Sequence, residues 1–306
     1  MKLGFSLLNN WGVDQPQALV DLACRAEEAG IDSVWVHDHV FNVGHVFDRI
    51  GGRPYYEPLT LLTYVAARTR RVRLGTSVLV LPYHNPVRLA KAAATLDVLS
   101  GGRLVVGVGA GWLKSEFDAV VTTPFPERGK VTDEYIDAFR LLWTEHSPRF
   151  DGRYTKIDGI VLEPKPVQKP HPPIWVGGEG PAALRRAARI GNAWYPIGSN
   201  NQHLLDTLPR LKAGIAKLRK ATTDAGRDPQ SVEVAFRVKR YGAAVPAKAS
   251  DGERRLFSGS EADLIGDLRA LKEMGVTAID IDFGRPTADA VLAEMNRFRK
   301  AVIDKV

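Results

Sequence analysis

The feature that most constrains the fold is a regular alternation of short apolar segments with longer amphipathic ones along nearly the whole chain. The short segments have the valine, leucine and isoleucine content of buried strands, and the longer ones repeat apolar residues with helical spacing. The expected strands are residues 3–8, 33–37, 73–81, 103–109, 174–176, 193–196, 232–238 and 278–283. The expected helices are residues 16–29, 59–69, 87–99, 130–144, 182–190, 204–225, 261–274 and 287–303. Alternation on this scale is typical of parallel β/α structure.

Eight strand–helix units predict an α/β fold, a single (β/α)8 TIM barrel with insertions after its strands. The 306 residues suit one such domain, which we expect to span residues 1–306. A doubly wound sheet is the alternative, but no Gly-x-Gly-x-x-Gly opens a helix after the first expected strand. Three long connections, 40–58, 147–173 and 242–260, are expected to carry lids or substrate loops. Residues 150–154 and 161–162 are expected to pair as a small hairpin.

Composition limits the compartment and the partners. Cys24 is the one cysteine, so no internal disulfide is expected and a reducing, cytoplasmic location is favoured. No apolar run approaches the roughly 20 residues of a membrane span, so no membrane partner is expected. The formal charge of +7 suits an anionic small-molecule ligand, or serves general solubility. Because the basic residues are dispersed, nucleic acid is not an expected partner.

Barrel enzymes place their chemistry at the carboxyl ends of the strands, and the second expected strand ends in His37-Asp38-His39. Two histidines two residues apart suit a metal-dependent hydrolase, with Asp280 or Asp282 as a later ligand. That chemistry needs further histidines after the fifth and sixth strands, where this chain has glycines and aromatic residues. We therefore expect no metal. His37 is expected to be a packed residue, and His39, at the start of the loop, is the better functional candidate.

Two glycine-rich strand ends are candidate ligand-binding sites. Gly177-Gly178-Glu179-Gly180-Pro181 precedes an expected helix, whose first N–H groups suit a phosphate; the alternative is a tight turn that needs positive φ. After the fourth strand, Gly107, Gly109 and Gly111 leave room for a flat ligand; the alternative is a narrow barrel interior. Aromatic residues at these strand ends suit a ring system or an apolar substrate, although each is individually more often a core residue. They are Trp112, Trp175, Trp194 and Tyr195.

Five segments, in this order and spacing, resemble the luciferase-like monooxygenase superfamily. They are 33–39 (SVWVHDH), 74–79 (LGTSVL), 100–103 (SGGR), 107–117 (GVGAGWLKSEF) and 173–178 (PIWVGG). This superfamily contains FMN-dependent monooxygenases and oxidoreductases that use the deazaflavin coenzyme F420. The resemblance implies a barrel, often homodimeric, with the flavin-like ring across the mouth formed by the carboxyl ends of the strands.

The pair Asp38-His39 and the Gly-Thr-Ser-Val segment resemble the deazaflavin branch most closely. The resemblance implies that His39 assists hydride or proton transfer and that Asp38 belongs to the cofactor site. It also implies a non-proline cis peptide between Ser77 and Val78, behind the ring. In the same way, Ala110, Gly111 and Trp112 are implied to contact the ring and tail, and Gly177, Gly178 and Glu179 to bind the phosphate.

One departure from that branch concerns the substrate. A sugar-phosphate dehydrogenase of the branch has a glutamate where this chain has Trp112, so a sugar-phosphate substrate is not expected and a more apolar pocket is. The resemblance thus predicts an F420-dependent oxidoreductase that acts on an unidentified small organic substrate. An FMN-dependent two-component monooxygenase and a non-catalytic flavin-binding barrel are the alternatives.

Overall fold

The computed structural model of the protein describes residues 1–285 and 287–306. Its main sheet contains β1 (Lys2–Ser6), β2 (Ser33–Val36), β3 (Arg73–Thr76), β4 (Leu79–Val80), β5 (Leu104–Gly109), β8 (Ile174–Gly177), β9 (Ala193–Tyr195), β10 (Glu233–Val238) and β11 (Val276–Ile281). The strands pair in the order β3-β2-β1-β11-β10-β9-β8-β5-β4, and β3 also pairs with β5, so the sheet closes on itself. Since β3 and β4 are halves of one barrel strand, the predicted (β/α)8 fold is confirmed.

The division between β3 and β4 lies inside residues 73–81, which the sequence predicted as one strand. The peptide bond between Ser77 and Val78 is cis, which confirms that prediction. On one side, the Ser77 N–H donates to the carbonyl of Val36 at 2.6 Å. On the other, Leu79 pairs in register with Val108 of β5. The segment is therefore tied to both neighbouring strands.

The main helices match the predicted ones to within a few residues. They are α1 (Pro16–Glu28), α3 (Pro58–Arg68), α4 (Pro86–Ser100), α6 (Arg128–Thr144), α7 (Pro181–Ile190), α8 (Leu208–Asp224), α9 (Glu261–Glu273) and α10 (Ala288–Ala301). Local chemistry sets their ends. Glu57 caps α3 by accepting from two backbone N–H groups, and Ser260 and Asp263 form a capping box at the start of α9.

Two short helices, α2 (His45–Ile50) and α5 (Lys114–Val120), were not predicted. Each is too short to show a helical repeat of apolar residues. In addition, α8 begins four residues later than expected, at Leu208, because Thr207 is extended and a proline occupies the first turn. Among the helices of the described residues, none is long and apolar enough to cross a membrane.

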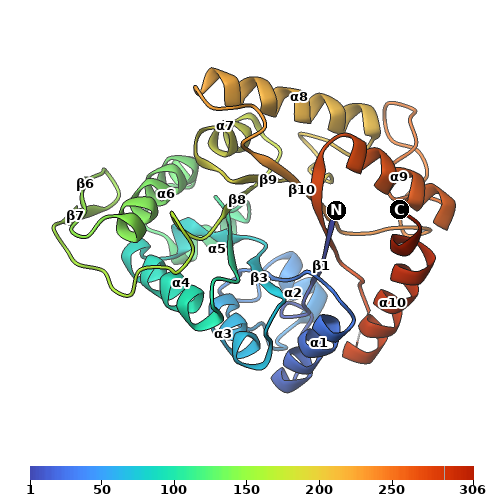
Figure 1. The fold of residues 1–306 in the computed structure, drawn as a ribbon, viewed down its shortest axis with the longest axis horizontal. Coiled ribbons are helices and arrows are strands. Elements are labelled where there is room, and N and C mark those ends of the chain that lie inside the picture. The colour runs from blue at the N-terminus through green and yellow to red at the C-terminus, as the bar shows by residue number, and fades with distance from the viewer. Residues whose placement is uncertain (286) are drawn as a thin grey trace. The chain divides into compact units, whose positions relative to one another are not determined.

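The chain forms two compact units, which are described separately. Unit I contains Met1–Leu7, Arg25–Trp35 and Trp175–Val306, and unit II contains Leu8–Cys24 and Val36–Ile174. In unit I, the rings of Trp35, Trp175 and Tyr195 pack with centroids 4.7 to 5.5 Å apart. In unit II, α4 packs between α3 and α6 (Figure 1). The Trp143 indole N–H on α6 donates to the Ala90 carbonyl on α4.

The predicted pairing of residues 150–154 with 161–162 is wrong. The hairpin is formed by β6 (Arg149–Asp151) and β7 (Lys156–Asp158), which lie beside α6 (Figure 1). Glu134 on α6 accepts hydrogen bonds from the backbone N–H groups of residues 153, 154 and 155, at 2.7 to 2.9 Å. This carboxylate fixes the turn, so the second strand begins directly after it. The sequence pattern of the hairpin itself does not reveal this hydrogen-bonding partner, because Glu134 lies in the preceding helix, α6.

Candidate active site

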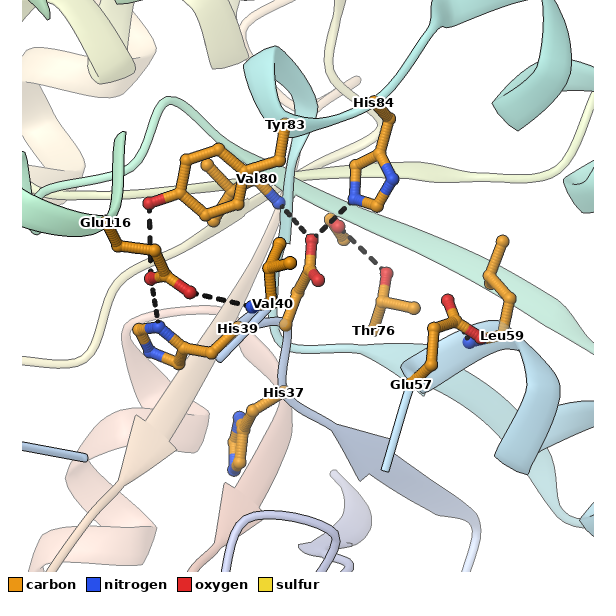
Figure 2. Close-up of polar contacts among 12 residues, drawn as sticks. His37, His39, Val40, Glu57, Leu59, Thr76, Val80, Tyr83, His84 and Glu116 are labelled. Atoms are coloured by element: carbon orange, nitrogen blue, oxygen red, sulfur yellow. Dashed lines mark hydrogen bonds and ion pairs between the residues drawn. The ribbon is translucent and has the colours of Figure 1, made fainter. Parts of the chain in front are cut away.

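A histidine–carboxylate pair lies after the second barrel strand, in unit II. His39 follows β2, and its Nδ1 lies 2.5 Å from Oε2 of Glu116, the third residue of α5 (Figure 2). The Glu116 side chain is fully buried, whereas 15% of the His39 side chain is exposed. Because a carboxylate only accepts hydrogen bonds, Nδ1 carries the proton and donates it. The other nitrogen, Nε2, is left to exchange a proton with a ligand.

The remaining hydrogen-bonding capacity of Glu116 is used by neighbouring residues. Its Oε1 accepts from the backbone N–H groups of Val40, at 2.7 Å, and Phe41, at 3.4 Å. The Tyr83 hydroxyl donates to Oε2 at 3.3 Å, so the carboxylate lies between the rings of Tyr83 and His39 (Figure 2).

The hydrogen bonds and charges around Glu116 keep its carboxyl group ionised. Burial alone raises the pKa of Glu116, but the His39 hydrogen bond and charge, with the two backbone N–H groups, outweigh it and lower that pKa from its ordinary value. Burial and the Glu116 carboxylate raise the pKa of Tyr83, so its hydroxyl stays a donor. The site therefore contains a carboxylate that orients the imidazole and can stabilise its protonated form.

Glu116 is a candidate functional residue that the sequence pattern did not single out, although it lies within the 107–117 segment. The helix that positions it, α5, is held by the fully buried Phe117, whose ring packs 5.2 Å from that of Phe125. An acidic residue directly before a large apolar one is compatible with an exposed helix face as well. Only the fold shows that this carboxylate points inward.

Asp38, expected in the cofactor site, is bonded to protein groups in this structure. Its Oδ2 accepts from the Val80 backbone N–H and from Nε2 of His84, both at 2.8 Å. Burial lowers the pKa of His84, but the hydrogen bond and charge of Asp38 and the charge of Glu57 outweigh it and raise that pKa. Asp38 therefore ties the end of β2 to β4, directly beyond the cis peptide. His37 is packed, as predicted: it is buried, and its Nδ1 lies 2.7 Å from the Ser77 carbonyl.

The glycines of β5 have a structural explanation. A Cβ atom at Gly107 would lie 1.8 Å from the Thr76 carbonyl oxygen, and one at Gly109 would lie 2.6 Å from Cγ2 of Val78. Gly111 has a φ of +81°, and a Cβ there would lie 2.8 Å from Val80. The three glycines therefore fit the alternative of a narrow barrel interior. The space beside them is filled by the protein's own β3–β4 segment.

The other cofactor candidates of unit II differ in accessibility. Ser77 is buried, whereas Val78 and Ala110 are only partly covered. Trp112 is 65% exposed, and its ring lies 4.8 Å from that of His45 at the start of α2. The structure thus brings His39 and the loop containing Trp112 close together, through ring contacts that include His45.

In unit I, the Gly177–Pro181 turn joins β8 to α7. Gly178 has a φ of +106°, and its carbonyl accepts from the Trp194 indole N–H at 2.8 Å. The Glu179 carboxylate accepts from the Ile197 N–H at 2.6 Å, and burial raises its pKa against the hydrogen bonds it receives. The N-cap of α7 is Gly180, which has no side-chain cap. The bend with positive φ is therefore present, and the start of α7 has no side-chain cap.

Unit I also contains a polar cluster at the carboxyl ends of four strands. The sequence did not predict that these side chains meet. Asp280 accepts from the Tyr195 hydroxyl at 2.7 Å and from the Ser6 hydroxyl at 3.2 Å, and its carboxylate lies 3.6 Å from Nε of Arg237. Burial raises the pKa of Asp280 to about 6, against the Arg237 charge and the Tyr195 hydrogen bond. Within residues 1–285 and 287–306, no three histidine, cysteine or acidic side chains are grouped as a metal site.

The Asp280→Asn variant is expected to change how the free energy of unfolding depends on pH. Because the pKa of Asp280 is raised to about 6 in the folded chain, the native state holds a proton between about pH 4 and about pH 6 that the unfolded chain has lost. This contribution to stability is full below about pH 4 and is lost as the pH rises through about 6. Urea denaturation across this range measures it as the wild-type free energy of unfolding minus that of the variant. That difference should fall with pH, and a flat or rising difference contradicts the prediction.

Comparison with known proteins identifies the family. A sequence model described as luciferase-like monooxygenase matches residues 1–285. The chain belongs to this family. The F420-dependent glucose-6-phosphate dehydrogenase of Amycolatopsis mediterranei is 34% identical over 218 residues, which cover 69% of this chain and 63% of that protein. The chain thus spans less than two thirds of that relative's length.

Two further proteins with other activities are also similar to this chain. The FMNH(2)-dependent dimethylsulfone monooxygenase of Pseudomonas putida is 26% identical, and the match covers 89% of this chain and 82% of that enzyme. A solved structure, an F420-dependent secondary alcohol dehydrogenase in complex with an F420-acetone adduct, has a TM-score of 0.79 at 22% identity and covers 98% of each chain. At this identity, the similarity to the solved structure shows a shared fold and nothing about activity.

Proposed function

We propose that this protein is an F420-dependent oxidoreductase that moves a hydride between the deazaflavin and a small organic substrate. The observation that carries the proposal is the buried Glu116 carboxylate bonded to Nδ1 of His39 at 2.5 Å. It leaves Nε2 as a general base or acid beside a loop of accessible residues. The dehydrogenase relative from Amycolatopsis mediterranei supports the choice of F420.

The chain's own residues perform the proton chemistry. Glu116 holds the imidazole in one tautomer and orientation, and Nε2 of His39 accepts a proton from a substrate hydroxyl, or returns it in the reverse direction. When that proton arrives, the negative charge of Glu116 stabilises the imidazolium. The Tyr83 hydroxyl and the Val40 N–H keep the carboxylate in place. The deazaflavin, when bound, supplies the carbon that accepts or donates the hydride.

The residues present fit an anionic cofactor. The first N–H groups of α7 have no side-chain cap, which suits a phosphate bound through Gly177, Gly178 and Glu179. Arg185 on that helix is exposed, whereas Arg186 is buried and so is the weaker candidate for the phosphate. The remaining proposed cofactor residues divide by exposure. Val78, Ala110, Gly111 and Trp112 offer accessible surface, while Asp38, Ser77, Gly107 and Gly109 are buried and would act by shaping the cis segment.

Binding titrations with F420 and with FMN, side by side, test the proposal. We expect F420 to bind more tightly, because its phosphodiester and oligoglutamate tail are anionic and the chain carries a net charge of +7. The F420 affinity should fall as salt is added, because salt screens exposed charges. Tight FMN binding with no detectable F420 binding would reject the deazaflavin assignment.

An FMN-dependent two-component monooxygenase is the second candidate function. The dimethylsulfone monooxygenase covers more of this chain than the dehydrogenase does, 89% against 69%. This function requires oxygen consumption with reduced FMN, which the F420 enzyme does not. A non-catalytic flavin-binding barrel is the remaining alternative, and it requires cofactor binding without turnover.

We also propose that residues 1–306 form one catalytic domain, that two copies associate as a homodimer, and that the protein is cytoplasmic. The family match over residues 1–285 supports the single domain. Exposed apolar side chains of unit II, at Leu99, Val161 and Val167, suit a contact between copies. The mass of the purified protein in solution, measured by light scattering, tests the dimer.

A further inference from the structure

The environment of His39 indicates which substrates this site accepts. Its Nδ1 edge is occupied by the buried Glu116 carboxylate, and 15% of the side chain is exposed, which leaves the edge that carries Nε2 for a ligand. A reacting group must therefore approach from that edge. The residues beside the ring on the accessible side determine what else of the substrate is contacted.

Aromatic rings from two segments flank His39, and a ring from a third segment packs against one of them. The His45 ring, at the start of α2, lies 5.7 Å from the His39 ring, and the Tyr55 ring, before α3, lies 5.6 Å from it, both edge-on. The Trp112 ring, after β5, lies 4.8 Å from that of His45. We call His45, Tyr55 and Trp112 the aromatic wall. All three belong to unit II, as His39 does.

The aromatic wall continues into exposed apolar surface. Trp112 is 65% exposed, and the residues directly after His39, Val40 and Phe41, are 53% and 39% exposed. A ligand that covers these side chains removes apolar surface from water, and this favours its binding. An apolar surface beside a proton-transferring group indicates a binding site for an apolar ligand.

Charge on this side of the site argues against an anionic substrate. The group bonded to His39 is the ionised carboxylate of Glu116, whereas the Arg128 guanidinium beside the Trp112 loop already donates to the carbonyls of Gly111 and Phe125. The Glu116 carboxylate repels a phosphate dianion. A strongly hydrated phosphate would also lose water on an aromatic surface without regaining equivalent hydrogen bonds.

We propose that the aromatic wall is the substrate-binding surface and that it selects uncharged alcohols or ketones with an aryl or alkyl body. The proposal rests on the proposed function. In the oxidising direction, Nε2 of His39 would take the hydroxyl proton, and a bound oxidised deazaflavin would accept the hydride from the carbinol carbon. The C–H and O–H bonds break, the carbonyl bond forms, and two electrons leave with the hydride. The reverse reaction reduces a ketone.

The test uses acetophenone as the probe and glucose 6-phosphate as the comparator, with binding measured by ligand-observed NMR on the full-length chain. Wild-type protein should bind acetophenone and should bind glucose 6-phosphate more weakly. Trp112→Ala should raise the Kd of acetophenone about tenfold, and Trp112→Phe should recover most of that loss. Ile160→Ala, which removes another exposed apolar side chain, is the matched control and should leave this Kd unchanged.

The outcomes separate the two proposals. An acetophenone Kd that is unchanged in Trp112→Ala, or tighter binding of glucose 6-phosphate than of acetophenone, overturns the substrate assignment. So does a Trp112→Ala variant that loses F420 affinity while acetophenone binding stays the same, because the aromatic wall would then hold the cofactor. Failure of the wild-type protein to bind F420 rejects the proposed function alone. In that case the acetophenone titration still reports on the wall.

Discussion

The His39→Ala variant is expected to lower kcat for hydride transfer by roughly 10²–10⁴-fold, the usual contribution of a positioned general acid or base. The Kd of F420 should change by much less, because the His39 side chain is mostly enclosed by the protein and bonded to Glu116. Single-turnover kinetics at saturating cofactor, together with an F420 titration, measure the two effects separately.

A companion variant, Glu116→Gln, keeps the shape of the side chain and removes its charge. We expect kcat to fall in this variant too, because the amide neither stabilises the imidazolium nor fixes one tautomer. The pH profile should shift as well, which a purely structural role would not cause. Unchanged turnover in His39→Ala with intact F420 binding contradicts the proposed role of His39. F420 binding by the wild-type protein without any turnover would favour a non-catalytic flavin-binding barrel.

The Gly107→Ala variant is expected to lose about 3 kcal/mol or more of the free energy of unfolding, at or above the upper part of the usual range for overpacking. The added Cβ would lie 1.8 Å from the carbonyl oxygen of Thr76. That oxygen belongs to the backbone of β3, and Leu74 of the same strand pairs with Leu104 of β5. The oxygen therefore cannot rotate away as a side-chain atom could. Denaturant titration followed by circular dichroism measures the loss.

Gly266→Ala is the matched control. Gly266 lies inside α9, and a Cβ there would meet nothing within 4 Å. Because alanine favours the helix over glycine, this variant should gain about 0.5–1 kcal/mol. Equal, small effects of the two substitutions would mean that β3 and β5 do not approach each other as closely as described.

The sequence predicted the barrel because the fold depends on periodicity, which is local. Each strand's apolar run and each helix's repeat is visible within a short window, and the eight units leave few arrangements. His39 was found for a related reason, since a polar residue directly after a buried strand is at the end where barrels place their chemistry. The hairpin was misplaced because the turn is fixed by Glu134, whose partners lie 19 to 21 residues further along the chain.

The partners of the site residues were harder to predict. Glu116 lies 77 residues from His39 in sequence, and it is carried on a helix too short for a periodic pattern. Asp280 was considered only as a metal ligand, whereas its partners Tyr195 and Ser6 come from two other strands. Which side chains meet depends on how those strands and helices pack, and no short stretch of sequence contains that information.

The bonding of Glu116 has a consequence for engineering. One buried carboxylate holds the imidazole of His39 and the N–H groups of Val40 and Phe41, so the backbone of this loop is fixed independently of the loop's own side chains. The side chains of Val40, Phe41 and Trp112 remain exposed, and exposed substitutions usually change stability by no more than about 0.5 kcal/mol. A library that varies these three positions should therefore change substrate range while folding and proton transfer persist. Substitution of Glu116 would impair folding of the loop and proton transfer at the same time.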